Sequence, residues 1–235
     1  MTKILFVCHG NICRSPMAEF ILKDMAERAG LAREFEIASA ATSTEELGNP
    51  VYPPVRRMLL EHGIGCEGKT ARRIRAADYD DWDLLIGFDD ANLRNMARLF
   101  GGDPEGKLHL LTEYAGRPGE IIDDPWYTRD FESAWEDIQE GCLGLLNTLI
   151  EEVTLDFSAC RKRAELYDIL AARMLWQPGY GRNLDALYDL LTGLPHLGSS
   201  FAVLLPAEDA PCRGYAEIMV QVFEDAGACV RVLED

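Results

Sequence analysis

A cysteine and an arginine stand six positions apart near the start of the chain, in a segment whose residue types suit attack on phosphorus. The segment spans residues 8–16, with Cys8 at its start and Arg14 near its end. A positive helix end and a nearby arginine favour a nucleophilic thiolate over the thiol. An arginine guanidinium can also donate two parallel hydrogen bonds to a phosphoryl group. Cys8 is therefore the predicted nucleophile, forming a phosphocysteine intermediate, and Arg14 is predicted to bind the phosphoryl oxygens.

The flanking residues predict a strand before this segment and a helix after it. Residues 4–7 are apolar and indicate a buried strand, while residues 17–22 have a helical pattern, with Ser15 as N-cap and Pro16 at the first helical position. The tight turn between them directs backbone N–H groups and the positive end of the helix dipole inward, so we expect an anion-binding loop. The predicted substrate-binding residues of this loop are His9, Gly10, Asn11, Ile12, Cys13 and Ser15.

A second phosphate-binding pattern occurs at residues 63–70, whose Gly-x4-Gly-Lys-Thr letters match a nucleotide-binding loop. Such a loop needs a strand before it and a buried helix after it. Here residues 55–62 have a helical pattern instead, and residues 71–75 are too polar to open a buried helix. The context therefore argues against a nucleotide site and favours the loop after Cys8.

Strand and helix patterns alternate along the remaining chain. Further strands are expected at residues 35–39, 83–88 and 107–111, and helices at 92–100 and 131–151. The alternation predicts an α/β fold with a parallel sheet, helices on both faces, and a ligand site at the carboxyl ends of the strands, where Cys8 lies. The pattern then restarts, with strands at 153–157, 201–205 and 229–233 and helices at 161–174, 183–191 and 215–225. We therefore expect two domains, residues 1–151 and a smaller α/β domain at 152–235.

Residues 7–16 resemble the low-molecular-weight protein tyrosine phosphatases, and the similarity continues through residues 124–127, covering about residues 1–150. The resemblance implies that Asp124 is the general acid, which protonates the leaving phenolate and later takes a proton from the hydrolytic water. It also implies an aromatic wall formed by Trp126 and Tyr127, consistent with phosphotyrosine in a protein substrate rather than phosphoserine. Hydrophobic anchoring of a long loop is the alternative for these two side chains. No cofactor is implied.

Two departures from the family pattern bear on the choice of peptide. His9 stands on the rim where an aliphatic residue is common, and Glu45 stands where some members place an aromatic residue. Arsenate reduction on the same fold is the second enzymatic hypothesis. That chemistry needs a relay of further cysteines, and residues 78–100 contain none.

Residues 180–193 resemble the barstar family of ribonuclease inhibitors, and the similarity covers about residues 152–235. The resemblance implies a ribonuclease-binding surface of four residues: Asp185, Tyr188, Asp189 and Glu217. The two aspartates lie four positions apart, on one helix face, where like charges repel but suit an inhibitor that imitates phosphates. A solvated helix face is the alternative. One departure is Gly179, which stands where a second aromatic contact is expected.

Two other roles remain open for this second domain. It could dock a substrate protein for the phosphatase, or it could be the functional part of a binding protein in which the phosphatase fold is a scaffold. Retention of Cys8, Arg14 and Asp124 together argues against the scaffold hypothesis.

Composition narrows the partners and the compartment. A net charge of −17 argues against nucleic acid or an anionic membrane as a partner. No apolar run could span a bilayer, and no signal peptide is evident. The seven cysteines have irregular spacing without a zinc pattern, so we expect no disulfide framework, no metal site and a reducing cytoplasm. Cys8 and Cys13 could form a protective disulfide, or Cys13 could be a packing residue, and both alternatives stay open.

Overall fold

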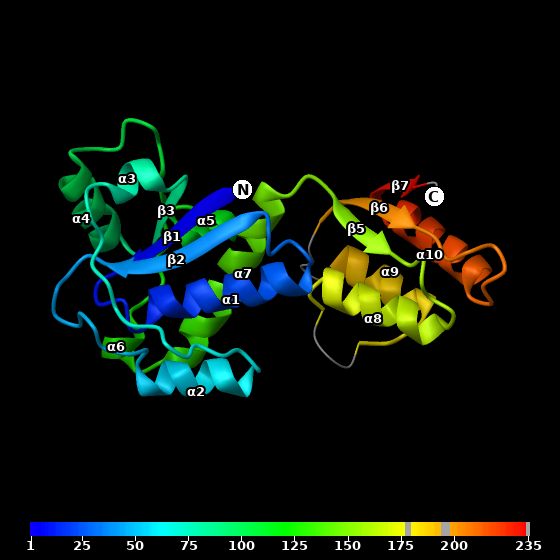
Figure 1. Cartoon of the computed structure of the whole chain (residues 1–235), viewed down its shortest axis with the longest axis horizontal. Helices are drawn as coiled ribbons and strands as arrows, with labels where there is room; N and C mark the ends of the chain where they lie inside the picture. Colours follow the sequence, from blue (N-terminus) through cyan, green and yellow to red (C-terminus); the bar gives the residue numbers. More distant parts are fainter. Residues whose placement is uncertain (177–179, 194–197, 234–235) are drawn as a thin grey trace. The chain divides into compact units, whose positions relative to one another are not determined.

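The protein is described by a computed structural model that covers residues 1–176, 180–193 and 198–233. The chain forms two compact units, one of residues 1–27 and 31–145 and one of residues 28–30 and 146–235. Each unit alternates strands and helices around its own parallel sheet (Figure 1). Within the described ranges, no helix is both long and apolar enough to cross a membrane.

The sheet of the first unit has four parallel strands. In spatial order they are β2 (Phe35–Ala41), β1 (Thr2–Cys8), β3 (Leu84–Gly87) and β4 (Leu108–Leu110). Because β1 lies between two neighbours and both its faces are covered, residues 4–7 are continuously apolar and fully buried. The predicted parallel sheet is confirmed, and Cys8 ends its first strand.

Helices cover both faces of this sheet. Leu5 and Val7 pack with Trp82 and Met96, on the face that carries α3 (Asp78–Asp81) and α4 (Asp90–Phe100). Successive strand residues point to opposite faces, so the residues between them point toward α1 (Arg14–Arg28) and α7 (Phe131–Leu149) (Figure 1). The connections hold three shorter helices: α2 (Pro53–Glu61), α5 (Leu111–Tyr114) and α6 (Pro125–Thr128).

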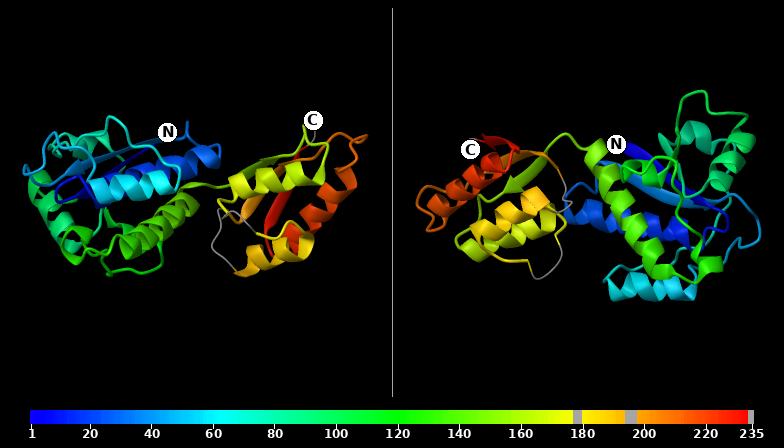
Figure 2. Two further views of the ribbon diagram at one scale, coloured as in Figure 1. Left: turned by 90° about the horizontal axis from the view of Figure 1, so that it is seen from below. Right: turned by 180° about the vertical axis from the view of Figure 1, so that it is seen from behind.

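The second unit has three parallel strands, β5 (Val153–Asp156), β6 (Ser200–Leu204) and β7 (Cys229–Leu233), in that order. Its helices are α8 (Arg163–Arg173), α9 (Leu184–Gly193) and α10 (Arg213–Asp225). Helix α10 contacts α9, α8 and β7 (Figure 2), and the Phe201 and Phe223 rings meet edge to face at 4.7 Å in the core. The predicted small α/β arrangement is confirmed.

The one-turn helices α3, α5 and α6 were not predicted. Each has four residues. A single turn is too short to show the 3.6-residue periodicity by which helices are found in a sequence.

Candidate active site

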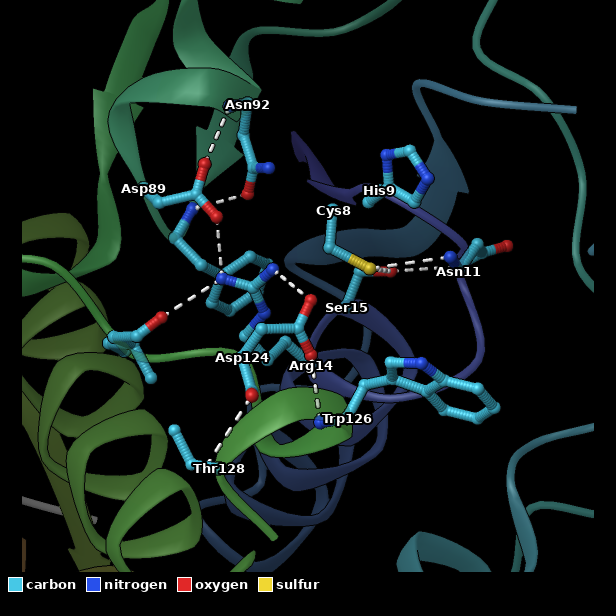
Figure 3. A network of polar contacts seen from close by, with 12 residues as sticks. Cys8, His9, Asn11, Arg14, Ser15, Asp89, Asn92, Asp124, Trp126 and Thr128 are labelled. Carbon is cyan, nitrogen blue, oxygen red and sulfur yellow. Dashed lines mark hydrogen bonds and ion pairs between the residues drawn. The ribbon is translucent and has the colours of Figure 1, made fainter. Parts of the chain in front are cut away.

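Cys8 lies at the carboxyl end of β1, where the chain turns into α1. Its side chain is buried, and its sulfur accepts the Asn11 backbone N–H at 3.3 Å and lies 3.0 Å from the Ser15 hydroxyl (Figure 3). The prediction of Ser15 as N-cap is wrong, because α1 already begins at Arg14. The Ser15 hydroxyl contacts the thiol instead of a helix amide. Pro16 still fits in the first turn, where an N–H needs no helical partner.

Asn11 fixes the shape of the loop between Cys8 and Arg14. Its φ of 57° is left-handed, as a tight turn here requires. The side-chain amide donates to the Ser15 hydroxyl at 2.9 Å and to the Ser39 hydroxyl at 2.7 Å, and its oxygen accepts the Arg72 N–H at 3.1 Å. Through these contacts the Asn11 side chain holds the loop from within.

Arg14 is a buried cation with one guanidinium nitrogen that has no partner among the described residues. One terminal nitrogen donates to Asp89 at 2.7 Å and to the Ile122 carbonyl at 2.9 Å, and the other donates to Asp124 at 2.5 Å (Figure 3). Burial alone would lower the pKa of Arg14, but the negative charges of Cys8, Asp124 and Asp89 outweigh burial and raise it. The buried Nε of Arg14 has no partner among the described residues, so it remains free to bind an anion.

Asp89 and Asp124 are each held by the start of a helix. Asp89 caps α4 by accepting the Asn92 N–H at 2.7 Å, and Asp124 caps α6 by accepting the Trp126 N–H at 3.1 Å. The neighbouring Asp123 is exposed and does not line the pocket. The sequence reasoning assigned no role to Asp89, although its place at the end of a strand on the same sheet edge was an available signal.

A pocket opens above the Cys8 sulfur. It is lined by Cys8, His9, Gly10, Ile12, Cys13, Glu45, Glu46, Asp124, Trp126 and Tyr127. Six of the eight predicted substrate-binding residues are in this set. Asn11 and Ser15 are not, because both side chains point into the structure behind the loop.

Two aromatic side chains form one wall of the pocket. Trp126 is 38% exposed and meets the Tyr52 ring edge to face at 5.0 Å. The Arg129 guanidinium lies over the Trp126 ring, 5.5 Å from the ring centroid. Tyr127 is 78% exposed. Tyr127 therefore contributes little to the core, and anchoring of the loop explains Trp126 better than Tyr127.

The lysine of the nucleotide-binding pattern lies in a buried network beneath the loop. The Glu19 carboxylate accepts hydrogen bonds from Lys69, Lys23 and the Ser39 hydroxyl, each at 2.6 Å. The Ser39 hydroxyl in turn accepts a hydrogen bond from the Asn11 side-chain amide. The pattern follows α2 rather than a strand. Its lysine is therefore committed to Glu19 and cannot serve a nucleotide.

Burial alone would raise the pKa of Glu19, but Lys69 and hydrogen bonds from Lys23, Lys69 and Ser39 hold it below its usual range. The pKa of Lys69 is lowered by burial, which Glu19 only partly offsets. Both pKa values are lowered, and the shift favours the charged form of Glu19 but disfavours the charged form of Lys69. A buried ion pair of this kind contributes little net stability, but removing one partner is costly.

We expect the substitution Lys69→Met to destabilise the first unit by about 3 kcal/mol at pH 7, because it leaves the buried Glu19 charge short of its main cation. A carboxylate with a lowered folded-state pKa contributes stability above its unfolded pKa and loses it as pH falls. The cost should therefore narrow toward pH 4, where Glu19 of the variant takes up a proton. The difference in unfolding free energy between the wild type and the variant is measured by urea unfolding at several pH values, followed by tryptophan fluorescence. A cost that does not depend on pH contradicts this explanation. The control is Lys3→Met, at a partly exposed lysine that pairs with Glu36, and it should cost under about 1 kcal/mol.

All seven cysteines are free, and Cys13 is buried in the loop. Burial raises the pKa of Cys13, and the charges of Cys8 and Asp124 raise it further. Cys13 therefore stays a neutral thiol, in contrast to a thiolate nucleophile. In the part of the chain that the structure describes, no three His, Cys, Asp or Glu side chains gather closely enough to hold a metal ion.

In the second unit, three of the four predicted partner-binding residues share α9. Asp185, Tyr188 and Asp189 are exposed at positions i, i+3 and i+4, which lie on one helix face. Glu217 is exposed on α10 and pairs with Arg213 at 2.7 Å. The predicted departure at Gly179 lies outside the described residues.

Comparison with known proteins agrees with the fold and identifies the family. The family model described as low molecular weight phosphotyrosine protein phosphatase matches residues 3–155, and the model described as barstar (barnase inhibitor) matches residues 150–232. YfkJ of Bacillus subtilis, a low molecular weight protein-tyrosine-phosphatase, is 35% identical over 157 residues, which is 66% of this chain and 100% of that protein. The chicken low molecular weight phosphotyrosine protein phosphatase is 35% identical over 147 residues, 61% of this chain and 92% of that protein.

Solved structures agree as well. The crystal structure of Bacillus subtilis YfkJ superposes with a TM-score of 0.61 at 35% identity, covering 63% of this chain and 94% of that one. A Drosophila protein described as an arginine phosphatase superposes with a TM-score of 0.59 at 33% identity, covering 64% of this chain and 99% of that one. The predicted enzyme family and the barstar-like module are confirmed: the chain belongs to the low molecular weight phosphotyrosine protein phosphatase family, and a barstar-like module follows its phosphatase domain.

Proposed function

We propose that the protein hydrolyses phosphotyrosine in proteins through a phosphocysteine intermediate on Cys8. One observation carries the proposal: Cys8 and Asp124 line the same pocket, and the buried Arg14 cation is paired with Asp124. A nucleophile, a group that binds phosphoryl oxygens and a general acid are the three parts that this reaction needs.

In the first step the Cys8 thiolate attacks phosphorus, and the bond between phosphorus and the phenolic oxygen breaks as Asp124 donates its proton to that oxygen. In the second step a water attacks the phosphorus of the phosphocysteine while Asp124 takes one of its protons. The bond between sulfur and phosphorus breaks, which regenerates the Cys8 thiolate and releases inorganic phosphate. The Asn11 N–H at 3.3 Å and the Ser15 hydroxyl at 3.0 Å stabilise the thiolate in both steps.

Arg14 would exchange one partner for another when the phosphoryl group binds. Its contacts with Asp89 and the Ile122 carbonyl hold one terminal nitrogen in place. The unpartnered Nε and the nitrogen now bound to Asp124 would donate to two phosphoryl oxygens. Asp124 is thereby released toward the leaving oxygen.

The exposed aromatic wall supports phosphotyrosine as the substrate, since Trp126 and Tyr127 can pack on a phenyl ring. Release of phosphate from matched phosphotyrosine, phosphoserine and phosphoarginine peptides tests this choice. Preferential turnover of the phosphotyrosine peptide is expected. Equal turnover of all three, or preference for phosphoarginine, contradicts it.

Arsenate separates the hydrolase from the reductase alternative. As a phosphate analogue it should inhibit the hydrolysis competitively and should not be consumed in the presence of a thiol reductant. Consumption of arsenate would instead support reduction. Residues 78–100 contain no cysteine that could act as the relay for that chemistry.

We further propose that residues 1–151 and 152–235 act as separate functional domains, the second of which binds a protein. The supporting observation is the exposed acidic face of Asp185, Tyr188 and Asp189, together with 14 acidic and 7 basic side chains in residues 151–235, a net charge of −7. Such a face suits a small basic ribonuclease of the barnase kind.

Binding of the full-length protein to such a ribonuclease tests this role. The double substitution Asp185→Asn/Asp189→Asn is expected to weaken binding at least about tenfold, since it removes two charges from the centre of the face. Glu224→Gln/Asp225→Asn, at the end of α10, changes the net charge equally and is the control. Ribonuclease binding is contradicted if the wild type does not bind the ribonuclease, or if the α9 variant binds it as tightly as the wild type. Docking of another protein is then the remaining role.

We also propose that the protein works in a reducing compartment such as the cytoplasm. Seven free thiols, six of them buried, support this location, because a secreted chain of this size commonly pairs its cysteines.

A further inference from the structure

We infer that the mouth of the pocket selects phosphotyrosine substrates whose flanking residues are basic, and that Glu45 and Glu46 are the residues that make this selection. The inference rests on the proposed phosphatase function and goes beyond it by specifying the charge of the substrate around the phosphorylated residue.

Both glutamates belong to the segment that follows β2 and line the pocket beside the loop after Cys8. Glu46 lies against Gly10, where an added Cβ would stand 3.2 Å from the Glu46 Cγ. Its carboxylate accepts the Asn49 amide at 2.6 Å. Glu46 is therefore held at the rim by packing on one side and a hydrogen bond on the other.

Glu45 is exposed and pairs with His9 across the rim at 3.2 Å. His9, labelled above Cys8 in Figure 3, is the only pocket-lining residue among the described ones that can carry a positive side chain. One imidazole carries at most one positive charge, so it cannot balance two carboxylates.

Two arginines contact pocket-lining residues, but neither pairs with the glutamates of the rim. Arg14 is buried below the loop and engaged by Asp89 and Asp124. Arg129 lies over Trp126 and donates to the Tyr52 hydroxyl at 3.2 Å, on the aromatic wall. The rim therefore carries an excess of negative charge above a site that binds a dianion.

The field of Glu46 reaches the loop itself. Burial is the main cause that raises the pKa of Cys13, and the charges of Cys8, Asp124 and Glu46 add to it, while Arg14 opposes them. A carboxylate that acts on a buried loop thiol also acts on charged substrate side chains that reach the rim.

This arrangement has a consequence for the peptide. The phosphoryl group is bound by Arg14 and the loop amides, but acidic residues beside it would meet Glu45 and Glu46 and be repelled. Basic residues at the same places would be attracted. We expect kcat/KM for a lysine-flanked phosphotyrosine peptide to exceed that for a glutamate-flanked peptide by about tenfold at low salt, and the ratio to shrink as salt screens the charges.

The net charge of −17 could produce a similar preference from a distance, so the test must separate the rim from the whole protein. The two peptides are compared on the wild type, on Glu45→Gln/Glu46→Gln, and on Asp80→Asn/Asp81→Asn. The control pair is exposed in α3, outside the pocket, and changes the net charge by the same amount. The ratio of the two kcat/KM values is the readout, because any general loss of activity cancels in it.

The expected result is a ratio near one for the rim variant and the wild-type ratio for the α3 variant, with Glu45→Lys shifting preference toward the acidic peptide. Absence of a preference in the wild type, an unchanged ratio in the rim variant, or an equal fall in both variants overturns the inference. Turnover of the peptides without charge preference leaves the phosphatase function intact. No turnover of either peptide or of p-nitrophenyl phosphate overturns the proposed function itself.

Discussion

Replacing Cys8 with serine is expected to abolish turnover of p-nitrophenyl phosphate, with a loss on the order of 10⁶-fold in kcat, as for other enzymes that lose their nucleophile. A serine hydroxyl in this position keeps the contacts with the Asn11 N–H and the Ser15 hydroxyl. It has no anionic form at neutral pH, so it cannot attack phosphorus. Initial rates at saturating substrate, with the folded state checked by circular dichroism, measure the effect.

Oxyanion binding should survive the same substitution, because Arg14 and the loop amides remain. Calorimetry measures the dissociation constant of arsenate from Cys8→Ser. This constant should agree within a few-fold with the inhibition constant of arsenate for the wild type. The control is Cys66→Ser, which removes another buried thiol outside the pocket and should keep nearly full turnover. Wild-type rates in Cys8→Ser would exclude Cys8 as the nucleophile.

The substitution Asp124→Ala is expected to reduce the rate by about 10²–10⁴-fold on phenyl phosphate, and much less on p-nitrophenyl phosphate. The reason is the leaving group: phenolate needs a proton as the bond to phosphorus breaks, whereas p-nitrophenolate is stable without one. A series of substituted phenyl phosphates should therefore show a steeper dependence of kcat on the acidity of the phenol in the variant than in the wild type.

Phosphate should bind at least as tightly to Asp124→Ala as to the wild type. In the structure, Asp124 occupies an Arg14 nitrogen at 2.5 Å, and an incoming phosphoryl oxygen has to compete for it. The matched control is Asp123→Ala, whose side chain is exposed and outside the pocket, and which should keep its rate on every substrate. Equal losses in the two variants, or a loss independent of the leaving group, would contradict the general-acid role.

The sequence was sufficient for features that depend on neighbouring residues. A buried strand, a tight turn and a helix start are local structures, so residues 4–22 alone predict that Cys8 and Arg14 face one anion-binding loop. Asn11 shows this well, because the left-handed turn that its type favours is present at φ 57°. The alternation of strands and helices likewise predicts parallel sheets, since only a crossover helix returns the chain for parallel pairing. Ser15 marks the limit, because its hydroxyl has two possible uses and the sequence does not choose between them.

Only the tertiary structure decided which distant residues complete the site. Asp89 reaches Arg14 because β3 pairs beside β1, which brings together residues 75 positions apart. Lys69 matches a nucleotide-binding pattern by its letters, yet it lies against Glu19, 50 positions away. Such contacts depend on the strand order β2-β1-β3-β4, and no periodicity or short motif encodes which segments that order makes neighbours. The sequence by itself therefore determined the nucleophile and its loop, and the packing of the sheet determined that Asp89 pairs with Arg14 and that Lys69 pairs with Glu19 beneath the loop.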